Sequence, residues 1–291
     1  MKLVLKFNLA LVLAFLVGFG AAAVVSHQLL FDNAREEILQ NARMIMASAI
    51  SARTYTSKQV APLLKKLPPD EFIPQTVPAF AATEQFNTLR VDFPDFNYKE
   101  ATLNPTNLRD KATDWEVDVV NKFKQSADLP ELVLEREAAT GPSLVMARPI
   151  RIKDEACLIC HSTVDVAPTA MLRKYGEANG FGWQLGDVIG AQIVSVPMSL
   201  PIRRAERAFA TFLTSLAGVF LVVFALLNVM LMVIVVRRVT RLARLADEVS
   251  LGKLDGPDFG VGGRDEVSGL GQSFNRMKRS LVQAMKMLED G

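Results

Sequence analysis

Cysteine and histidine are scarce in this sequence, with two of each among its 291 residues. A single pair of cysteines excludes a fold that is held together by several disulfides. The formal net charge is only +2, so the chain lacks the strong positive charge of nucleic-acid-binding proteins, and no nucleic-acid partner is expected. The second histidine, His27, borders a hydrophobic stretch, which excludes a Ser-His-Asp catalytic set; the sequence therefore indicates a protein that is not an enzyme.

Charged side chains are absent from two long stretches. Residues 7–25 read FNLALVLAFLVGFGAAAVV, and residues 208–236 read AFATFLTSLAGVFLVVFALLNVMLMVIVV. A helix needs about 20 apolar residues to cross a bilayer. We therefore expect one transmembrane anchor within residues 1–26 and a second transmembrane helix within residues 207–236.

The first stretch has a competing interpretation, because its basic start and small-residue end are also typical of a cleaved signal peptide. Its length favours an anchor that stays in place. Orientation follows from positive charge, since Lys2 and Lys6 precede the first stretch and Arg237 and Arg238 follow the second. The sequence thus predicts a two-pass protein with both termini in the cytoplasm and residues 27–206 outside.

The external segment begins with helical periodicity and ends with the pattern of strands. Thr113 and Glu116 form a capping box at the start of a helix, while SLVMARPIRI and VIGAQIVSVPM read as strands. Helices followed by strands predict an α+β domain with an antiparallel sheet. The stripe of a long amphipathic helix after the first anchor is formed by Leu30, Ala34, Ile38, Ala42, Ile45 and Ala49.

Both cysteines stand in the sequence Cys157-x-x-Cys160-His161, which is the attachment signature of c-type haem. Two thiols on one helical turn share a face and can form thioethers with one porphyrin, while His161 binds the iron as proximal ligand. We expect one covalently attached haem c. A zinc site and a redox dithiol are the alternatives, but zinc lacks further Cys or His ligands and a dithiol leaves His161 unexplained.

Weaker patterns suggest the other haem contacts. Met44, Met46 or Tyr55 is a candidate distal ligand of the iron, and packing in the core is the alternative for both methionines. Arginines would pair with haem propionates and aromatic rings would wall the crevice, or else these residues are solvated and packed in the ordinary way. The candidates for this pocket are Arg53, Tyr55, Arg148, Arg173, Tyr175, Phe181 and Trp183.

The C-terminal segment, residues 237–291, carries a heptad seam made by Leu270, Phe274, Met277, Leu281, Ala284 and Leu288. Such a seam needs partner helices, unless it is only a solvated amphipathic tail. The segments RLARLADEVSLGKLD and RDEVSGLGQSFNRMKRSL resemble a HAMP domain, although Thr240 and Ser268 depart from its pattern. The resemblance implies a helix–connector–helix unit that forms a homodimeric four-helix bundle below the membrane and passes signals inward.

Residues 52–197 resemble the periplasmic, c-haem-binding PAS-like sensor domain that precedes HAMP segments in bacterial receptors. The matching pieces are ARTYTSKQVAPLL, TLNPTNLRDKATDWE, ARPIRIKDEACLICHS, YGEANGFGW and GAQIVSVP. The resemblance implies a haem held against a PAS-like sheet in the periplasm, within a protein of the inner membrane. Some members carry a distal cysteine ligand, whose position falls within residues 53–57, where this chain has no cysteine.

Two functions fit these features. A transmembrane sensor would detect redox state or a small gas at the haem and signal through the HAMP segment; since no kinase or methyl-accepting segment follows, we expect a separate cytoplasmic effector. The alternative is a membrane-anchored monohaem cytochrome c that transfers electrons to a redox partner. The heptad seam on the cytoplasmic side favours the sensor, because external electron transfer gives it no role.

Overall fold

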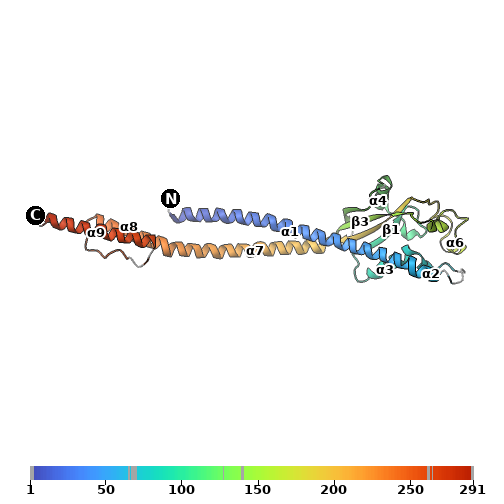
Figure 1. The fold of residues 1–291 in the computed structure, drawn as a ribbon, viewed down its shortest axis with the longest axis horizontal. Helices are drawn as coiled ribbons and strands as arrows, with labels where there is room; N and C mark the ends of the chain where they lie inside the picture. The colour runs from blue at the N-terminus through green and yellow to red at the C-terminus, as the bar shows by residue number, and fades with distance from the viewer. Residues whose placement is uncertain are drawn as a thin grey trace. The chain divides into compact units, whose positions relative to one another are not determined.

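The computed structural model describes residues 3–64, 66, 71–126, 128–138, 141–260, 263 and 265–289. The chain divides into two compact units, one of residues Gln28–Ala208 and one that combines Met1–His27 with Phe209–Gly291. Two long helices, α1 (Leu3–Tyr55) and α7 (Ser199–Met230), belong partly to each unit (Figure 1).

The unit Gln28–Ala208 contains a four-stranded antiparallel sheet in the order β1-β4-β3-β2. This architecture confirms the predicted α+β class. The strands are β1 (Asn97–Thr102), β2 (Leu132–Ala138), β3 (Gly141–Arg151) and β4 (Val188–Pro197). The helices around them are α2 (Ala61–Leu64), α3 (Pro78–Leu89), α4 (Asp114–Gln125), α5 (Leu158–His161) and α6 (Thr169–Tyr175), with short 3-10 turns at Pro74–Thr76, Leu108–Asp110 and Glu155–Cys157.

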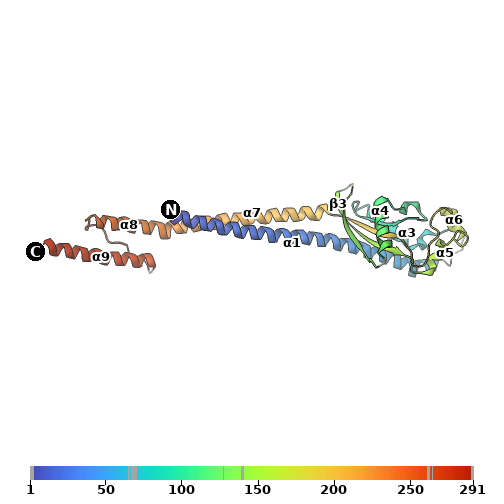
Figure 2. The same cartoon turned by 90° about the horizontal axis from the view of Figure 1, so that it is seen from above.

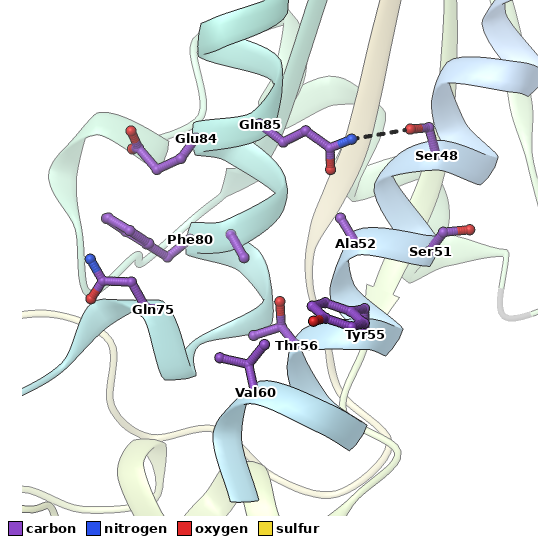
Figure 3. A pocket seen from close by; sticks show the side chains of 11 residues that line it. Ser48, Ser51, Ala52, Tyr55, Thr56, Val60, Gln75, Phe80, Glu84 and Gln85 are labelled. Carbon is purple, nitrogen blue, oxygen red and sulfur yellow. Dashed lines mark hydrogen bonds between the residues drawn. The ribbon is translucent and has the colours of Figure 1, made fainter. Parts of the chain in front are cut away.

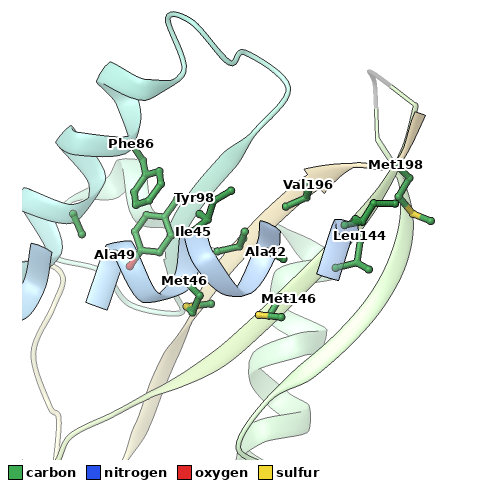
Figure 4. Close-up of a cluster of buried hydrophobic side chains, with 13 residues drawn as sticks. Ala42, Ile45, Met46, Ala49, Phe86, Tyr98, Leu144, Met146, Val196 and Met198 are labelled. Carbon is green, nitrogen blue, oxygen red and sulfur yellow. The ribbon is translucent and has the colours of Figure 1, made fainter. Parts of the chain in front are cut away.

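Helices cover both faces of the sheet because its central strands are apolar on both sides. On β3, Leu144 and Met146 belong to one core cluster, while Val145 and Ala147 belong to the other, as the two-residue period of a strand requires. The first cluster joins the sheet to α1 and α3 (Figure 4), and the second joins it to α4. The alternating residues therefore build two cores rather than one.

Helix α1 packs on the sheet through the predicted stripe. Ala34, Ile38, Ala42, Ile45 and Ala49 are all buried, with exposures of 8% or less. Helix α3 lies beside the end of this stripe, where the Gln85 amide donates to the Ser48 hydroxyl across 3.5 Å (Figure 3). The periodicity read from the sequence is thus confirmed for this part of α1.

The predicted capping box at the start of α4 is confirmed. The Glu116 carboxylate accepts from the Thr113 backbone N–H at 2.7 Å, and it also pairs with the Lys99 ammonium at 2.7 Å. The cap starts the helix where its apolar face can bury Val119 and Phe123 against the sheet.

In the other unit, the apolar parts of α1 and α7 lie side by side (Figure 2). The Phe15 and Phe220 rings stack with centroids 4.7 Å apart. Among the described residues, two helices are long and apolar enough to cross a membrane, judged by length and composition. A π-helical turn, Leu231–Val236, follows α7 and continues into α8 (Arg237–Ser250).

Helix α8, a connector and α9 (Glu266–Glu289) form the expected helix–connector–helix unit. Leu242 and Leu245 of α8 pack with Phe259 of the connector, against Phe274 of α9. The predicted seam on α9 is largely exposed, with Leu270, Met277 and Leu281 at 48%, 54% and 42%; the side chain of Leu288 lies outside the described residues. An exposed apolar seam is what partner helices would cover.

One side chain holds the connector on α9, and its removal provides a test. The buried Asn275 amide accepts from the Phe259 N–H at 2.9 Å and donates to the Phe259 carbonyl at 3.0 Å. We expect Asn275→Ala to leave both groups unsatisfied at a cost of about 1–3 kcal/mol. Hydrogen exchange of the Phe259 amide should then be faster, whereas Ser273→Ala, on the exposed side of α9, should leave it unchanged; equal exchange in both variants would contradict this account.

Candidate functional site

Cys157 to His161 form a short helical turn, and a residue just before it in the sequence caps its start. The Asp154 carboxylate accepts from the Ala156 N–H at 2.8 Å, and this cap starts the 3-10 turn that leads into α5. Cys157 and Cys160 are half-buried thiols three residues apart on this turn. This spacing puts the two sulfur atoms on the same face.

His161 is held in one orientation by contacts on its ring. Its Nδ1 lies 2.8 Å from the Gly180 carbonyl oxygen, and the Trp183 ring stacks on it with centroids 3.9 Å apart. A carbonyl can only accept, so Nδ1 carries the proton and Nε2 keeps its lone pair. The imidazole can therefore bind an electrophile or a metal through Nε2, while its Nδ1–H is already bonded to the Gly180 carbonyl.

Three separate chain segments meet at His161. The Gly180 N–H donates to the Asn104 side chain at 3.2 Å, and the Trp183 N–H donates to the His161 carbonyl at 3.2 Å. Gly180 has a φ of +88°, and a Cβ on it would collide with the Thr106 hydroxyl. Only glycine allows this close approach. Asn104 and Thr106 were not singled out from the sequence, although the Asn-Pro-Thr turn is a detectable signal for them.

Burial sets the protonation of the turn. It lowers the pKa of His161, against the opposing effect of the Gly180 carbonyl, so the imidazole is neutral at pH 7. Burial, followed by the charge of Asp154, raises the pKa of the Cys157 thiol. Reactive dithiols of the thioredoxin type need the opposite shift, so this environment disfavours that alternative. A zinc site is likewise unsupported, since no three His, Cys, Asp or Glu side chains converge among the described residues.

Arg53, in the last turn of α1, acts on the Cys157–His161 turn through its charge. Its guanidinium forms an ion pair with the buried Glu100 carboxylate, and its positive charge acts to lower the pKa of Cys157. Glu100 also accepts from the Tyr98 hydroxyl at 2.8 Å, and that hydroxyl accepts from the Gln192 amide at 3.0 Å. A buried polar chain thus connects α1 with β1 and β4 beside the turn.

A pocket of about 700 Å³ opens between α1 and α3 (Figure 3). Tyr55 lines it from the end of α1, Thr56 lines it from the π-helical turn that follows, and Phe80 and Glu84 line it from α3. Glu84 pairs with Arg109, whose guanidinium lies 5.0 Å from the centre of the Phe80 ring. Tyr55, which lines this pocket, is 63% exposed.

The other sequence-predicted residues lie in ordinary surroundings. Met46 is fully buried in the core cluster of α1 and α3, which favours packing over ligation, while Met44 is 64% exposed. The Arg148 guanidinium is bonded to Glu131 at 2.8 Å and 2.9 Å. Tyr175 packs edge-on to another aromatic ring, 5.6 Å away. The stacking contact thus brings Trp183 to the turn, the charge of Arg53 acts on Cys157 there, and Arg148 and Tyr175 have partners elsewhere.

The close contact at Gly180 can be separated from backbone strain, because Gly182 has a similar φ of +80° and no atom within 4 Å of the place where a Cβ would stand. We expect Gly182→Ala to cost about 1–2 kcal/mol through the left-handed backbone alone. Gly180→Ala should cost about 2–5 kcal/mol, because the Thr106 contact adds overpacking. Urea unfolding of the full chain in detergent, followed by tryptophan fluorescence, measures both; equal losses would show that the contact with Thr106 does not matter.

Comparisons with known proteins give the chain a family. Residues 31–197, more than half of the chain, match the family model Tll0287-like, and residues 230–288 match the HAMP domain model. The crystal structure of the cyanobacterial heme-protein Tll0287 is 18% identical, with a TM-score of 0.40 over 52% of this chain and 94% of that chain. No curated protein matches the chain. Because the first model covers over half of its length, the chain belongs to the Tll0287-like family.

Proposed function

We propose that this protein is a membrane-bound, haem-based sensor that detects redox state or a small gas outside the cytoplasmic membrane and signals through its HAMP domain to a cytoplasmic effector. The observation that carries the proposal is the fixed His161 imidazole, with Nδ1 bonded to Gly180 and Nε2 left to bind, next to two thiols on one turn. The same chain continues into a HAMP domain.

The residues of the turn fit a covalently attached haem. Cys157 and Cys160 would form the thioethers, and His161 would be the proximal ligand through Nε2. The bond from Nδ1 to a backbone carbonyl is the usual support of a metal-bound histidine, because it fixes the tautomer and the ring orientation. Haem supplies an iron that exchanges one electron and offers a sixth position to a ligand.

The residues around the turn would influence both the redox state of the haem and the binding of a gas. Trp183 stacks on one face of the His161 ring. Arg53 contributes a positive charge, which would favour the reduced over the oxidised site. Tyr55, which like Met44 is an exposed candidate for the distal side, would hydrogen-bond a gas or occupy the sixth position.

Signalling rather than electron transfer is supported by the α8–α9 unit. HAMP domains typically work in dimeric signalling complexes, and the exposed seam at Leu270, Met277 and Leu281 provides the surface for a second copy. Two apolar helices, followed by this unit, suit a receptor that spans the inner membrane twice with its termini in the cytoplasm. Electron transfer outside the membrane would leave α8 and α9 without a role.

Attachment is tested by removing the thiols. We expect Cys157→Ala combined with Cys160→Ala to abolish the haem that stays with the polypeptide under denaturing conditions, because no thioether can form. Peroxidase staining of the denaturing gel measures it, with Ser162→Ala as the matched control on the same turn. Persistent covalent haem in the double variant would refute the site.

The sixth position is tested with carbon monoxide. Absorption spectra of the reduced full-length protein, before and after addition of the gas, should show a shift of the main haem band if the position is open or weakly held. Tyr55→Phe should then alter the affinity for the gas several-fold, while Val133→Ala, on an outer strand, should not. A spectrum that ignores the gas would exclude gas sensing and leave redox sensing as the proposal.

A further inference from the structure

A charged pair buried beside the candidate site joins the long helix α1 to the sheet. Glu100, on β1, is only 4% exposed, and its carboxylate is engaged by the Arg53 guanidinium and the Tyr98 hydroxyl. The Gln192 amide, on β4, donates to the same hydroxyl at 3.0 Å. Each polar group of this network has a partner, as buried polar groups require.

The network holds its charges under ordinary conditions. Burial lowers the pKa of Arg53, but the charge of Glu100 and the hydrogen bond to it outweigh burial and raise it overall. Burial, together with the charge of Glu100, raises the pKa of Tyr98, so its hydroxyl remains a neutral donor. Arg53 is therefore a permanent cation whose main partner is one buried carboxylate.

The positive charge of Arg53 also acts on the candidate site. Its charge acts on the Cys157 thiol, while its backbone belongs to the last turn of α1. The regular helix ends two residues later and continues as the π-helical turn Thr56–Val60. Turns of this kind are frequent at functional sites, because their backbone hydrogen bonds are easily rearranged. The Arg53 cation is thus paired with a carboxylate of the sheet and also acts electrostatically on the Cys157–His161 turn.

We propose that the Arg53–Glu100 ion pair is the contact through which a charge change at the Cys157–His161 turn reaches α1. The inference rests on the proposed haem function. When an external one-electron donor reduces the site, the charge of the site falls by one; Arg53 is then drawn toward the turn and its bond to Glu100 weakens. Oxidation by a one-electron acceptor restores the pair. The end of α1 is therefore held more firmly to the sheet in the oxidised state.

Coupling of this kind is reciprocal, so the pair must also set the balance between oxidised and reduced protein. Glu100→Gln keeps the shape and the hydrogen bond to Tyr98 but removes a buried negative charge, and should raise the reduced-to-oxidised ratio at fixed potential about five- to tenfold. Arg53→Gln should lower that ratio by a similar factor. The matched control is Arg35→Gln, which breaks the exposed Arg35–Glu135 pair between the same helix and the same sheet; it should leave the ratio unchanged.

How firmly the end of α1 is held to the sheet is measured by hydrogen exchange of residues 48–55. The full-length protein is compared in the oxidised and the dithionite-reduced state. Exchange should be faster in the reduced wild-type protein and equal in both states of Glu100→Gln, because that variant has no pair to weaken. Tyr98→Phe, which removes one donor to Glu100, should lie between them and serves if Glu100→Gln does not fold. In the haem-free Cys157→Ala, Cys160→Ala protein, Glu100→Gln should still speed exchange at these residues.

Different results would overturn the proposed haem function and the proposed role of the Arg53–Glu100 pair. Wild-type protein without covalent haem would overturn the proposed function itself. Wild-type protein that binds haem but shows the same exchange in both redox states would overturn only the inference about Arg53 and Glu100. A redox-dependent difference that survives in Glu100→Gln, or that disappears in Arg35→Gln, would also overturn it.

Discussion

The chemistry of the candidate site depends on the hydrogen bond between the His161 Nδ1 and the Gly180 carbonyl. It assigns the proton of the imidazole and leaves Nε2 as the atom that can bind. The bond exists because Gly180 adopts a φ of +88° and lies against Thr106, where any side chain would collide. The neighbouring Trp183 fixes the plane of the ring. A turn with two thiols would otherwise be an ordinary surface feature.

Helix α1 gives this site its connection to the rest of the chain. Its residues 7–25 are apolar and uncharged, as a membrane span requires, and its second half is buried on one face against the sheet. Arg53, at its end, is the point where that element contacts the Glu100 carboxylate. The structure thus provides a continuous helix with a charged contact at one end, and signalling through it is the proposed function.

Periodic features could be predicted from the sequence, because one local rule decides each of them. The buried stripe from Ala34 to Ala49, the capping box at Thr113 and the apolar alternation around Met146 follow from helix and strand geometry alone. The contacts of His161 could not be predicted in this way, since Gly180 and Thr106 are distant in sequence from it. The carboxylate partners of Arg148 and Arg53 could not be predicted either, because only the folded sheet brings Glu131 and Glu100 close to them.

If the protein is the proposed sensor, a change at the haem alters the α8–α9 unit, and this alteration can be measured as a distance between two copies. Full-length protein in lipid nanodiscs, spin-labelled in place of Met277 on the exposed seam, would be measured by pulsed dipolar spectroscopy when oxidised and when reduced. The account predicts a defined distance between copies that changes with redox state in the wild-type background and stays constant in the haem-free Cys157→Ala, Cys160→Ala protein. An unchanged distance in protein that carries haem and is fully reduced would contradict it.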